Sequence, residues 1–270
     1  MHGLAALRVE QPAAIGGLDI LTGTELRHDA ATTPRDALAQ TGWLTSVTGD
    51  VLDLLAKQAV LHRMPAGSTL FEQAETPAFA LLLASGTIEL LAVRGTDEKL
   101  VELVRAPDLV LPAAVLNKQP YLLRARVLDD ARLVMIQAEA FRAAVASDPN
   151  LCLAVLACLA AQFRRQIKHA KNLQLRSAEE RVGCYLLKLL EDAPPITSVK
   201  LPREKRLIAS RLGMTRETFS RTLAIIAKHG LRVVGDVVCL EDIAAARARF
   251  QLDPLIDGHE PMHPLRVKRN

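Results

Sequence analysis

Aromatic side chains are scarce in this chain. Its 270 residues include one Trp, two Tyr and six Phe, although half of all residues are apolar. A hydrophobic core must therefore be built mainly from Leu, Val, Ile and Ala. The length suits either one large domain or two domains of ordinary size.

Cysteine is also scarce, and its spacing excludes a disulfide framework and a zinc site. We expect all four cysteines to be small buried hydrophobic residues. A Gly-rich phosphate loop, a nucleophile–base pair and a metal triad are all lacking, so nothing in the sequence supports an enzyme or a bound metal. The cysteines are Cys152, Cys158, Cys184 and Cys239.

Long apolar runs are missing as well, since none reaches the roughly twenty residues that span a bilayer. The residues Met1-His2-Gly3 do not open a basic region followed by an apolar run, as a secretory signal would. We therefore expect a cytoplasmic protein that has no membrane partner.

Positive charge is concentrated in one segment, although the net charge is only +4. Between Lys200 and Arg232 there are nine Lys and Arg residues but only two acids, Glu204 and Glu217. A local excess of this kind suits a polyanion such as DNA. By itself, it is equally typical of a solvated helix face.

The first half of the chain divides into two segments. Residues 1–42 are rich in Ala, Gly and Thr with weak periodicity, which predicts a loosely packed extension. Residues 43–147 begin with a short amphipathic helix over 46–59. Short apolar runs separated by turn residues then extend from 61 to 136, which predicts an antiparallel barrel or sandwich. Such a barrel either encloses a small ligand or is filled by side chains.

Asp148-Pro149 then begins a long predicted helix over residues 148–175. It carries two apolar faces, one with the alternating four- and three-residue spacing of a coiled-coil seam. Both apolar faces must be covered. The simplest arrangement packs one face on the barrel and the other on the same helix of a second copy, in a homodimer. The alternative is a core helix of a monomer. The seam is Cys152, Leu156, Leu159, Phe163, Ala170 and Leu173, and the second face is Leu153, Val155, Ala157, Ala160 and Ile167.

Residues 176–250 have the pattern of a winged helix-turn-helix. Ser177 and Glu180 form a capping box that begins a helix. A helix over 202–212, with Leu207, Ile208 and Leu212 apolar and Ala209 small, is followed by Gly213 where a left-handed residue is needed. The alternating stretch 231–240 turns at Gly235-Asp236 and forms the predicted wing. Residues 251–270 form the predicted C-terminal tail.

The second helix of this motif, over residues 216–229, is the candidate DNA-reading element. Its N-cap is Thr215, and Phe219, Leu223 and Ile226 face back to the first helix. Arginine donates to guanine and glutamate accepts from cytosine, while serine adapts to several base edges. The alternative is a solvated helix with a Glu217–Arg221 ion pair. The predicted DNA-binding residues are Thr215, Arg216, Glu217, Thr218, Ser220 and Arg221, with Lys205 and Arg206 on phosphate.

The segment Leu212-Gly-Met-Thr-Arg-Glu-Thr-Phe-Ser-Arg221 resembles the CRP/FNR superfamily of transcription regulators, and the resemblance extends over about residues 43–250. It implies an α+β chain with a β-roll sensor at 43–147, a dimerisation helix at 148–175 and a winged helix-turn-helix at 176–250. The recognition helix is similar to the FNR type because Ser220 stands where the CRP type has Gly. This implies a palindromic half-site like TTGAT. Residues 204–210 and 254–257 also resemble an FtrB-like subgroup.

The chain departs from the family's cyclic-nucleotide pattern. Where the pattern has Gly-Glu it has Leu111-Pro112, and where it has Arg-Ser it has Tyr121-Leu122 or, shifted by one residue, Leu122-Leu123. Arg124 and Arg126 are out of register. An apolar pocket without these anchors would desolvate a phosphate and offer no partner. We therefore expect no cAMP or cGMP.

An iron–sulfur cluster of the FNR kind is also not expected, since no cysteine precedes Cys152. The alternative to a regulator without a cofactor is a haem-based gas sensor of the same fold, with His62 or a side chain of the extension as axial ligand. The expected partners are double-stranded DNA, a second copy of the chain and, for an activator, RNA polymerase.

Overall fold

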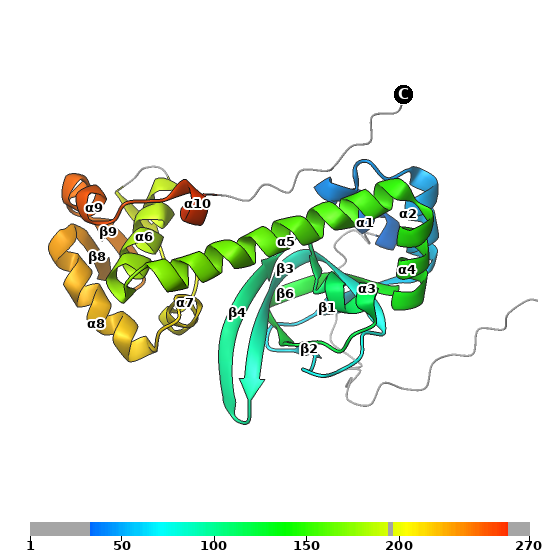
Figure 1. Ribbon diagram of the computed structural model, residues 1–270, viewed down its shortest axis with the longest axis horizontal. Coiled ribbons are helices and arrows are strands. Elements are labelled where there is room, and N and C mark those ends of the chain that lie inside the picture. Colours follow the sequence, from blue (N-terminus) through cyan, green and yellow to red (C-terminus); the bar gives the residue numbers. More distant parts are fainter. Residues whose placement is uncertain (1–32, 194–196, 259–270) are drawn as a thin grey trace, which may run out of the picture. The chain divides into compact units, whose positions relative to one another are not determined.

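The computed structural model describes residues 33–193 and 197–258. Residues 1–32 of the predicted extension and 259–270 of the predicted tail lie outside the described residues. An antiparallel β-roll with covering helices comes first, the long helix α5 follows, and a small winged helix-turn-helix completes the chain (Figure 1). The predicted α+β class and the predicted order of its three parts are confirmed.

The β-roll is antiparallel throughout the described pairings, and its main path runs β1-β6-β3-β4. Strand β2 adds to β6, and β5 adds to β3. The runs predicted as separate strands at 79–83 and 88–93 are one strand, β3, and those at 127–128 and 133–136 are one strand, β6. The strands are β1 (Ala59–Met64), β2 (Thr69–Phe71), β3 (Phe79–Arg94), β4 (Asp97–Arg105), β5 (Asp108–Val110) and β6 (Arg124–Gln137).

Bulges explain why β3 and β6 continue through residues that resemble turns. The pairing register shifts between Leu83 and Ser85 and again between Ser85 and Thr87. Gly86 has φ +91°, and a Cβ on it would lie 2.5 Å from the carbonyl oxygen of Asp130. A bulge accommodates the extra residue and bends the strand without ending the ladder.

Two hydrophobic cores lie on opposite faces of the sheet. Successive side chains of a strand point to opposite sides. In β3, Ala80 and Leu82 therefore join the core beneath the helices, whereas Leu81 and Leu83 join the interior of the roll. The roll is thus filled from its own strands, and the helices cover its outer face.

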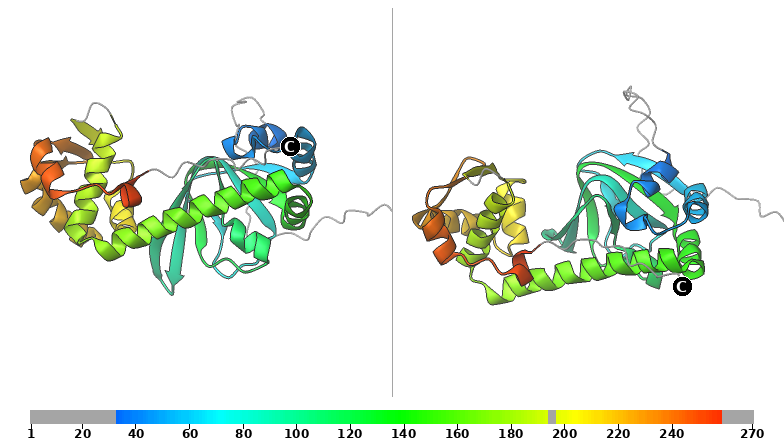
Figure 2. Two further views of the ribbon diagram at one scale, coloured as in Figure 1. Left: turned by 45° about the horizontal axis from the view of Figure 1, so that its top comes forward. Right: turned by 90° about the horizontal axis from the view of Figure 1, so that it is seen from above.

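The sensor begins earlier than predicted. Thr33 and Asp36 form a capping box at α1 (Pro34–Ala39), and Ala37 and Leu38 are buried in the core beneath the helices. Residues 34–41 therefore belong to the sensor rather than to the extension. Figure 2 shows α1 and α2 beside α4 at the same end of the roll. The sensor helices are α1, η1 (Gly42–Leu44), α2 (Gly49–Lys57), α3 (Pro112–Asn117) and α4 (Ala138–Ser147); α1, η1, α3 and α4 were not predicted.

Helix α5 (Pro149–Leu175) confirms the predicted long helix, and the Asp148 side chain caps it by accepting from the Leu151 amide at 2.6 Å. Its division into two faces was partly wrong. Leu151, Ala154 and Cys158 face the sensor core, whereas Ala160 and Ile167 lie on the exposed side. No single described helix is long and apolar enough to cross a membrane, and α4 with α5 meets that test only as a pair bent by 112°.

The C-terminal part contains the predicted winged motif. Both hydrogen bonds of the Ser177–Glu180 capping box are present. The first helix of the motif is shorter than predicted because Pro202 precedes it rather than opening it. Its elements are α6 (Ala178–Glu191), β7 (Ser198–Lys200), α7 (Lys205–Arg211), α8 (Arg216–Ile226), η2 (Ala227–His229), β8 (Leu231–Val234), β9 (Val237–Leu240), α9 (Ile243–Arg249) and α10 (Pro254–Asp257).

Part of the predicted tail also folds into this unit. Arg176 at the end of α5 forms a bidentate ion pair with Asp257 of α10, at 2.8 and 2.6 Å. The expectation that all four cysteines are buried holds for Cys158 and Cys184, but Cys152 is exposed and Cys239 is half-buried.

Gly183 provides a test of the packing between α6 and α9. Its ideal Cβ would lie 2.2 Å from the ring of the buried Phe250. Ala ordinarily stabilises a helix interior over Gly by about 0.8–1 kcal/mol. Here overpacking reverses the sign, and we expect Gly183→Ala to lower the unfolding free energy by about 1–3 kcal/mol in a urea titration.

The matched control is Gly42→Ala, since nothing lies within 4 Å of that Cβ. It should change stability little. Adding Phe250→Leu to Gly183→Ala should show favourable coupling in a double-mutant cycle. An unchanged or raised stability of Gly183→Ala alone would contradict the described contact.

Candidate DNA-binding interface

The two helices of the motif meet at a tight turn. Ala209 and Phe219 are fully buried where α7 and α8 pack, as predicted. Gly213 has φ +67°, and the Met214 amide donates to the Ala209 carbonyl at 3.0 Å. This backbone angle favours glycine, and a Cβ at Gly213 would also lie 2.7 Å from the end of the Leu173 side chain, which would have to move.

Helix α8 presents polar side chains along one face. Thr215 is its N-cap and accepts from the Thr218 amide at 3.2 Å. The opposite face is buried through Phe219 and Ile226, with Leu223 half-buried, as predicted. Four of the predicted base-reading residues are exposed: Arg216, Glu217, Ser220 and Arg221.

The charges on this face are not neutralised by one another. Glu217 and Arg221 form no ion pair in the described part of the chain, and Arg221 instead contacts the Thr218 hydroxyl at 3.4 Å. Hydrogen bonding from its own helix-end amide and from Thr215 lowers the pKa of Glu217, so its carboxylate stays ionised at neutral pH. Both charged groups therefore remain available to an external partner.

The predicted phosphate contacts lie at the start of α7. Arg206 is exposed and Lys205 is half-buried. Strands β8 and β9 form the wing hairpin around Gly235-Asp236, and Val199 of β7 pairs with β9. Lys200 forms an ion pair with Asp236 at 3.1 Å and partly neutralises the acid at the wing tip.

The structure also shows contacts of the sensor with Arg203, just before α7, and with α7 itself that the sequence did not reveal. Arg203 pairs with Asp129 through two hydrogen bonds of 2.8 and 2.5 Å and donates to Thr87 at 2.9 Å. Leu207, one of the predicted apolar positions of the first helix, packs against Leu91 and Leu100 of the β-roll. No local pattern signals these contacts, because their partners lie more than 70 residues apart in sequence.

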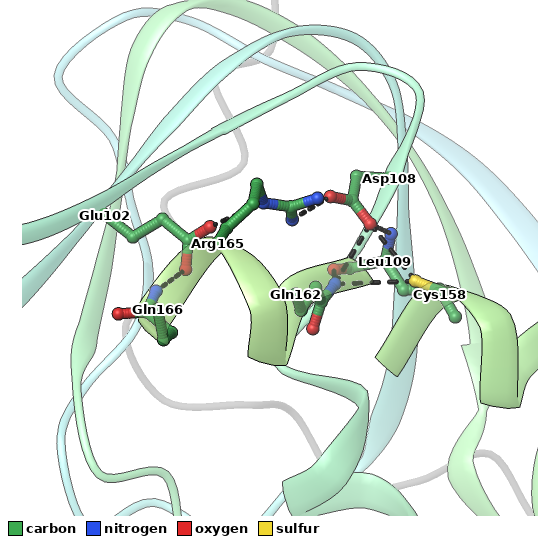
Figure 3. Close-up of polar contacts among 7 residues, drawn as sticks. All are labelled: Glu102, Asp108, Leu109, Cys158, Gln162, Arg165 and Gln166. Atoms are coloured by element: carbon green, nitrogen blue, oxygen red, sulfur yellow. Dashed lines mark hydrogen bonds and ion pairs between the residues drawn. The ribbon is translucent and has the colours of Figure 1, made fainter. Parts of the chain in front are cut away.

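A second unpredicted feature is the polar cluster between the β-roll and α5 (Figure 3). Arg165 donates to Glu102 at 3.1 Å and to Asp108 at 2.6 Å. Gln162 donates to Asp108 at 3.0 Å, and Gln166 donates to Glu102. Both carboxylates are buried, so the guanidinium and the two amides compensate for their desolvation.

The buried thiol of Cys158 also belongs to this cluster. Cys158 donates to Asp108 at 3.2 Å. Burial raises the pKa of this thiol, and the Asp108 charge acts in the same direction. Cys158 is therefore a neutral hydrogen-bond donor rather than a reactive thiolate.

The residues that stand in place of the cyclic-nucleotide pattern have structural roles or lie at the surface. Leu111 adopts a left-handed conformation before α3, and Pro112 is its buried first residue. Tyr121 stacks on Phe71 with ring centroids 3.6 Å apart, inside the roll. Leu122 is 83% exposed. None of these residues places a cation in the roll.

The two nearby arginines already have anionic partners. Arg124 forms ion pairs with Glu72 at 2.7 Å and with Glu98. Arg126 pairs with the buried Glu89 and, at 3.1 Å, with Glu98. Three carboxylates thus surround two guanidinium groups, and no positive charge is left over for a phosphate.

The predicted haem ligand His62 lies in β1, opposite Leu133 of β6, and is half-buried. Across residues 33–193 and 197–258, no group of three or more His, Cys, Asp and Glu side chains could hold a metal ion. The residues of the extension that were considered as ligands lie outside the described part.

Two family models match the chain in the order that the structure gives. The cyclic nucleotide-binding domain matches residues 61–148, and the Crp-like helix-turn-helix domain matches residues 180–247. The first covers the β-roll and α4, and the second covers α6 to α9. Together they define a sensor joined to a DNA-binding motif.

Several known regulators are similar to this chain. It is 28% identical to the nitrogen fixation regulation protein FixK of Azorhizobium caulinodans, over 67% of this chain and 73% of that one. It is 26% identical to the CRP-like cAMP-activated global transcriptional regulator of Mycobacterium tuberculosis, over 79% and 99%. The structure of FixK2 from Bradyrhizobium japonicum matches at a TM-score of 0.59 and 18% identity, over 72% and 98%, and supports the fold. The chain belongs to the CRP/FNR superfamily of transcription regulators.

Proposed function

We propose that this regulator binds an interrupted palindrome with TTGAT-like half-sites as a homodimer. The observation that carries the proposal is the exposed set of Arg216, Glu217, Ser220 and Arg221 on α8, in which Glu217 and Arg221 form no ion pair within the described chain. In a two-fold dimer, two such helices meet major grooves about one helical turn apart. The half-site sequence follows from the similarity of Glu217-x-x-Ser-Arg221 to the FNR-type helix.

Each exposed side chain has a distinct task in this proposal. Glu217 and Arg221 read one G·C pair, because a carboxylate accepts from cytosine N4 and a guanidinium donates to guanine O6 and N7. Ser220 lies beside a flanking thymine. Lys205 and Arg206 contact phosphate and contribute affinity without sequence preference.

Arg221→Ala and Lys205→Ala should therefore fail differently in a binding-site selection at fixed salt. Loss of a bidentate base contact costs about 1–3 kcal/mol and relaxes the preference at that pair. Arg221→Ala should lose the G·C preference. Lys205→Ala should keep it, bind every sequence less tightly and lower the salt slope by about one for each phosphate contact removed.

Arg94→Ala is a control for the loss of one cation, because Arg94 is an exposed sensor residue. It should bind as the wild type does. If Arg221→Ala retains the wild-type preference at every position, α8 does not read bases in the proposed way.

The homodimer is proposed to form along the exposed face of α5. Leu156 is 52% exposed and Phe163 is 66% exposed, and Ile167 lies on the same side. Apolar side chains gathered on one helix face indicate a covering partner, and the coiled-coil spacing makes a second α5 the fitting cover. Leu159, a predicted seam residue, packs against the sensor core and is a poor site for testing this interface.

Leu156→Glu with Phe163→Glu should give monomers, because the pair would bring like charges together at the two-fold interface. Sedimentation velocity measures the outcome. Leu122→Glu is the matched control, since Leu122 is an exposed leucine of the sensor, and it should leave the dimer intact. An unchanged dimer in the double variant would show that the interface lies elsewhere.

The sensor is proposed to take neither cAMP nor cGMP. The support is chemical, since Leu111-Pro112 and Tyr121-Leu122 offer no anchors and Arg124 and Arg126 are already surrounded by carboxylates. We also propose no haem and no iron–sulfur cluster, no catalytic activity, action in the cytoplasm, and RNA polymerase as a partner if the protein activates transcription.

Isothermal titration calorimetry should show no saturable heat with cAMP or cGMP at millimolar concentration. A micromolar dissociation constant would overturn this part of the proposal and leave the DNA-reading part untouched. An absorption spectrum of the same sample provides the second check, because a Soret band would show that haem is bound.

A further inference from the structure

A cavity of about 390 Å³ lies where the second half of α5 meets α6, the end of α7 and α10. Six of its lining residues are arginine or lysine, and a single lining residue, Asp257, is acidic. Predominantly positive walls around a partly enclosed volume are uncommon in a protein without a ligand, because like charges repel and each loses water.

Several of these cations already have anionic partners. Arg165 is held by Glu102 and Asp108, and Arg176 is held by Asp257. Lys188 pairs with Asp192 at 2.6 Å. These ion pairs leave no positive charge for a ligand, which leaves Arg181 and Arg211 as the two arginines of the cavity without a carboxylate partner.

Arg181 is oriented by carbonyl oxygens rather than by acids. It donates to the Leu212 and Arg176 carbonyls, both at 2.8 Å, and Nη2 donates to none of the described residues. No carboxylate of the described chain lies within ion-pair distance of it. These carbonyl groups and a longer contact to the Leu173 carbonyl at 3.5 Å hold its position, and no full negative charge is paired with it.

Arg211 has even fewer partners. Within the part of the chain that the structure describes, its guanidinium forms neither a hydrogen bond nor an ion pair. Burial lowers the pKa of Arg211; the Glu102 charge and Tyr185 oppose this effect, whereas the charges of Arg105 and Arg165 add to it. Burial and then the Arg211 charge also lower the pKa of His169 on the same wall.

Arg211 also lines a second, smaller cavity of about 210 Å³, together with Arg105 and Arg203. Tyr185 and Leu212 also line both cavities. Arg211 is a half-buried cation without a hydrogen-bonded or ion-paired partner among the described residues, and the more distant Glu102 charge offsets its loss of solvation only in part, since the pKa stays lowered. An anion placed between Arg181 and Arg211 would supply the missing charge and accept from both guanidinium groups.

We propose that this cavity binds a small phosphorylated molecule, with its phosphate group between Arg181 and Arg211. The volume lies near the lower end of the range of about 300–1,000 Å³ that small-molecule sites occupy, which suits a ligand no larger than a mononucleotide. Forked guanidinium donors favour phosphate groups carrying two or more charges over the singly charged diester of a cyclic nucleotide. None of the base-reading residues of α8 lines this site.

The test is calorimetry of the full-length chain with pyrophosphate and with AMP, at an ionic strength held constant with potassium chloride. Saturable binding of at least one probe is expected for the wild type. Arg211→Gln should weaken it at least tenfold, and Arg211→Lys, which keeps the charge but not the fork, should weaken it less. Arg94→Gln, a distant exposed arginine, should bind as the wild type does.

Two further measurements distinguish a ligand site from a structural arginine and from anion binding on the DNA-reading face. Because Arg211 has no partner, Arg211→Gln should not lower the thermal midpoint in phosphate-free buffer, whereas loss of a purely structural arginine would. Arg216→Gln, on the DNA-reading face, should retain probe binding. Absence of saturable binding of both probes to the wild type, or binding that is lost with Arg216→Gln and kept with Arg211→Gln, would overturn the proposal.

Discussion

The buried pairing of Arg165 with Glu102 and Asp108 fixes how α5 is rotated on the β-roll. Gln162, Arg165 and Gln166 are spaced so that they share one side of the helix, and all three reach the same two carboxylates. Removing one partner of a buried ion pair costs about 3–5 kcal/mol, because it leaves the other charge desolvated and alone. The helix therefore has one favourable rotational setting.

That setting decides what the rest of α5 presents. With Arg165 directed at the sheet, Phe163 and Ile167 point away from it and remain uncovered. Toward the C-terminal end, His169 and Arg176 line the cavity beside α6. The surface proposed for the partner helix and the cavity proposed for the phosphorylated ligand are thus two sides of one helix, both oriented by the same buried cluster.

Local signals predicted the C-terminal part better than the sensor. The Ser177–Glu180 capping box, the left-handed Gly213 and the 3.6-residue periodicity of α8 each act within a few residues, so the sequence reveals them directly. The roll depends on pairing between distant strands, and the bulges at Ser85-Gly86 resemble turns until their partners are known.

The contacts between the sensor and the helix-turn-helix part could not be predicted either, because their partners also lie far apart in the sequence. Arg203 appeared only as one member of a basic segment, yet Asp129 and Thr87 of the roll hold it. Leu207 has the spacing of a motif core residue but packs on the sensor. In the sequence, Arg165 resembles any solvent-exposed arginine on the polar side of a helix. Its partners Glu102 and Asp108 come close to it only in the folded chain.

Strand β4 lies at one end of the main sheet path, where its outer backbone groups pair with no further strand of the described residues. Helix α7 covers part of this edge, since the Leu100 amide donates to the Ser210 hydroxyl at 3.0 Å and Leu207 packs against Leu100 and Leu91. Uncovered sheet edges readily pair with strands of other molecules and start aggregation. Helix α7 therefore also protects the sensor from association through the β4 edge. A rearrangement that moved α7 away would expose unpaired backbone groups of β4 to strands of other molecules.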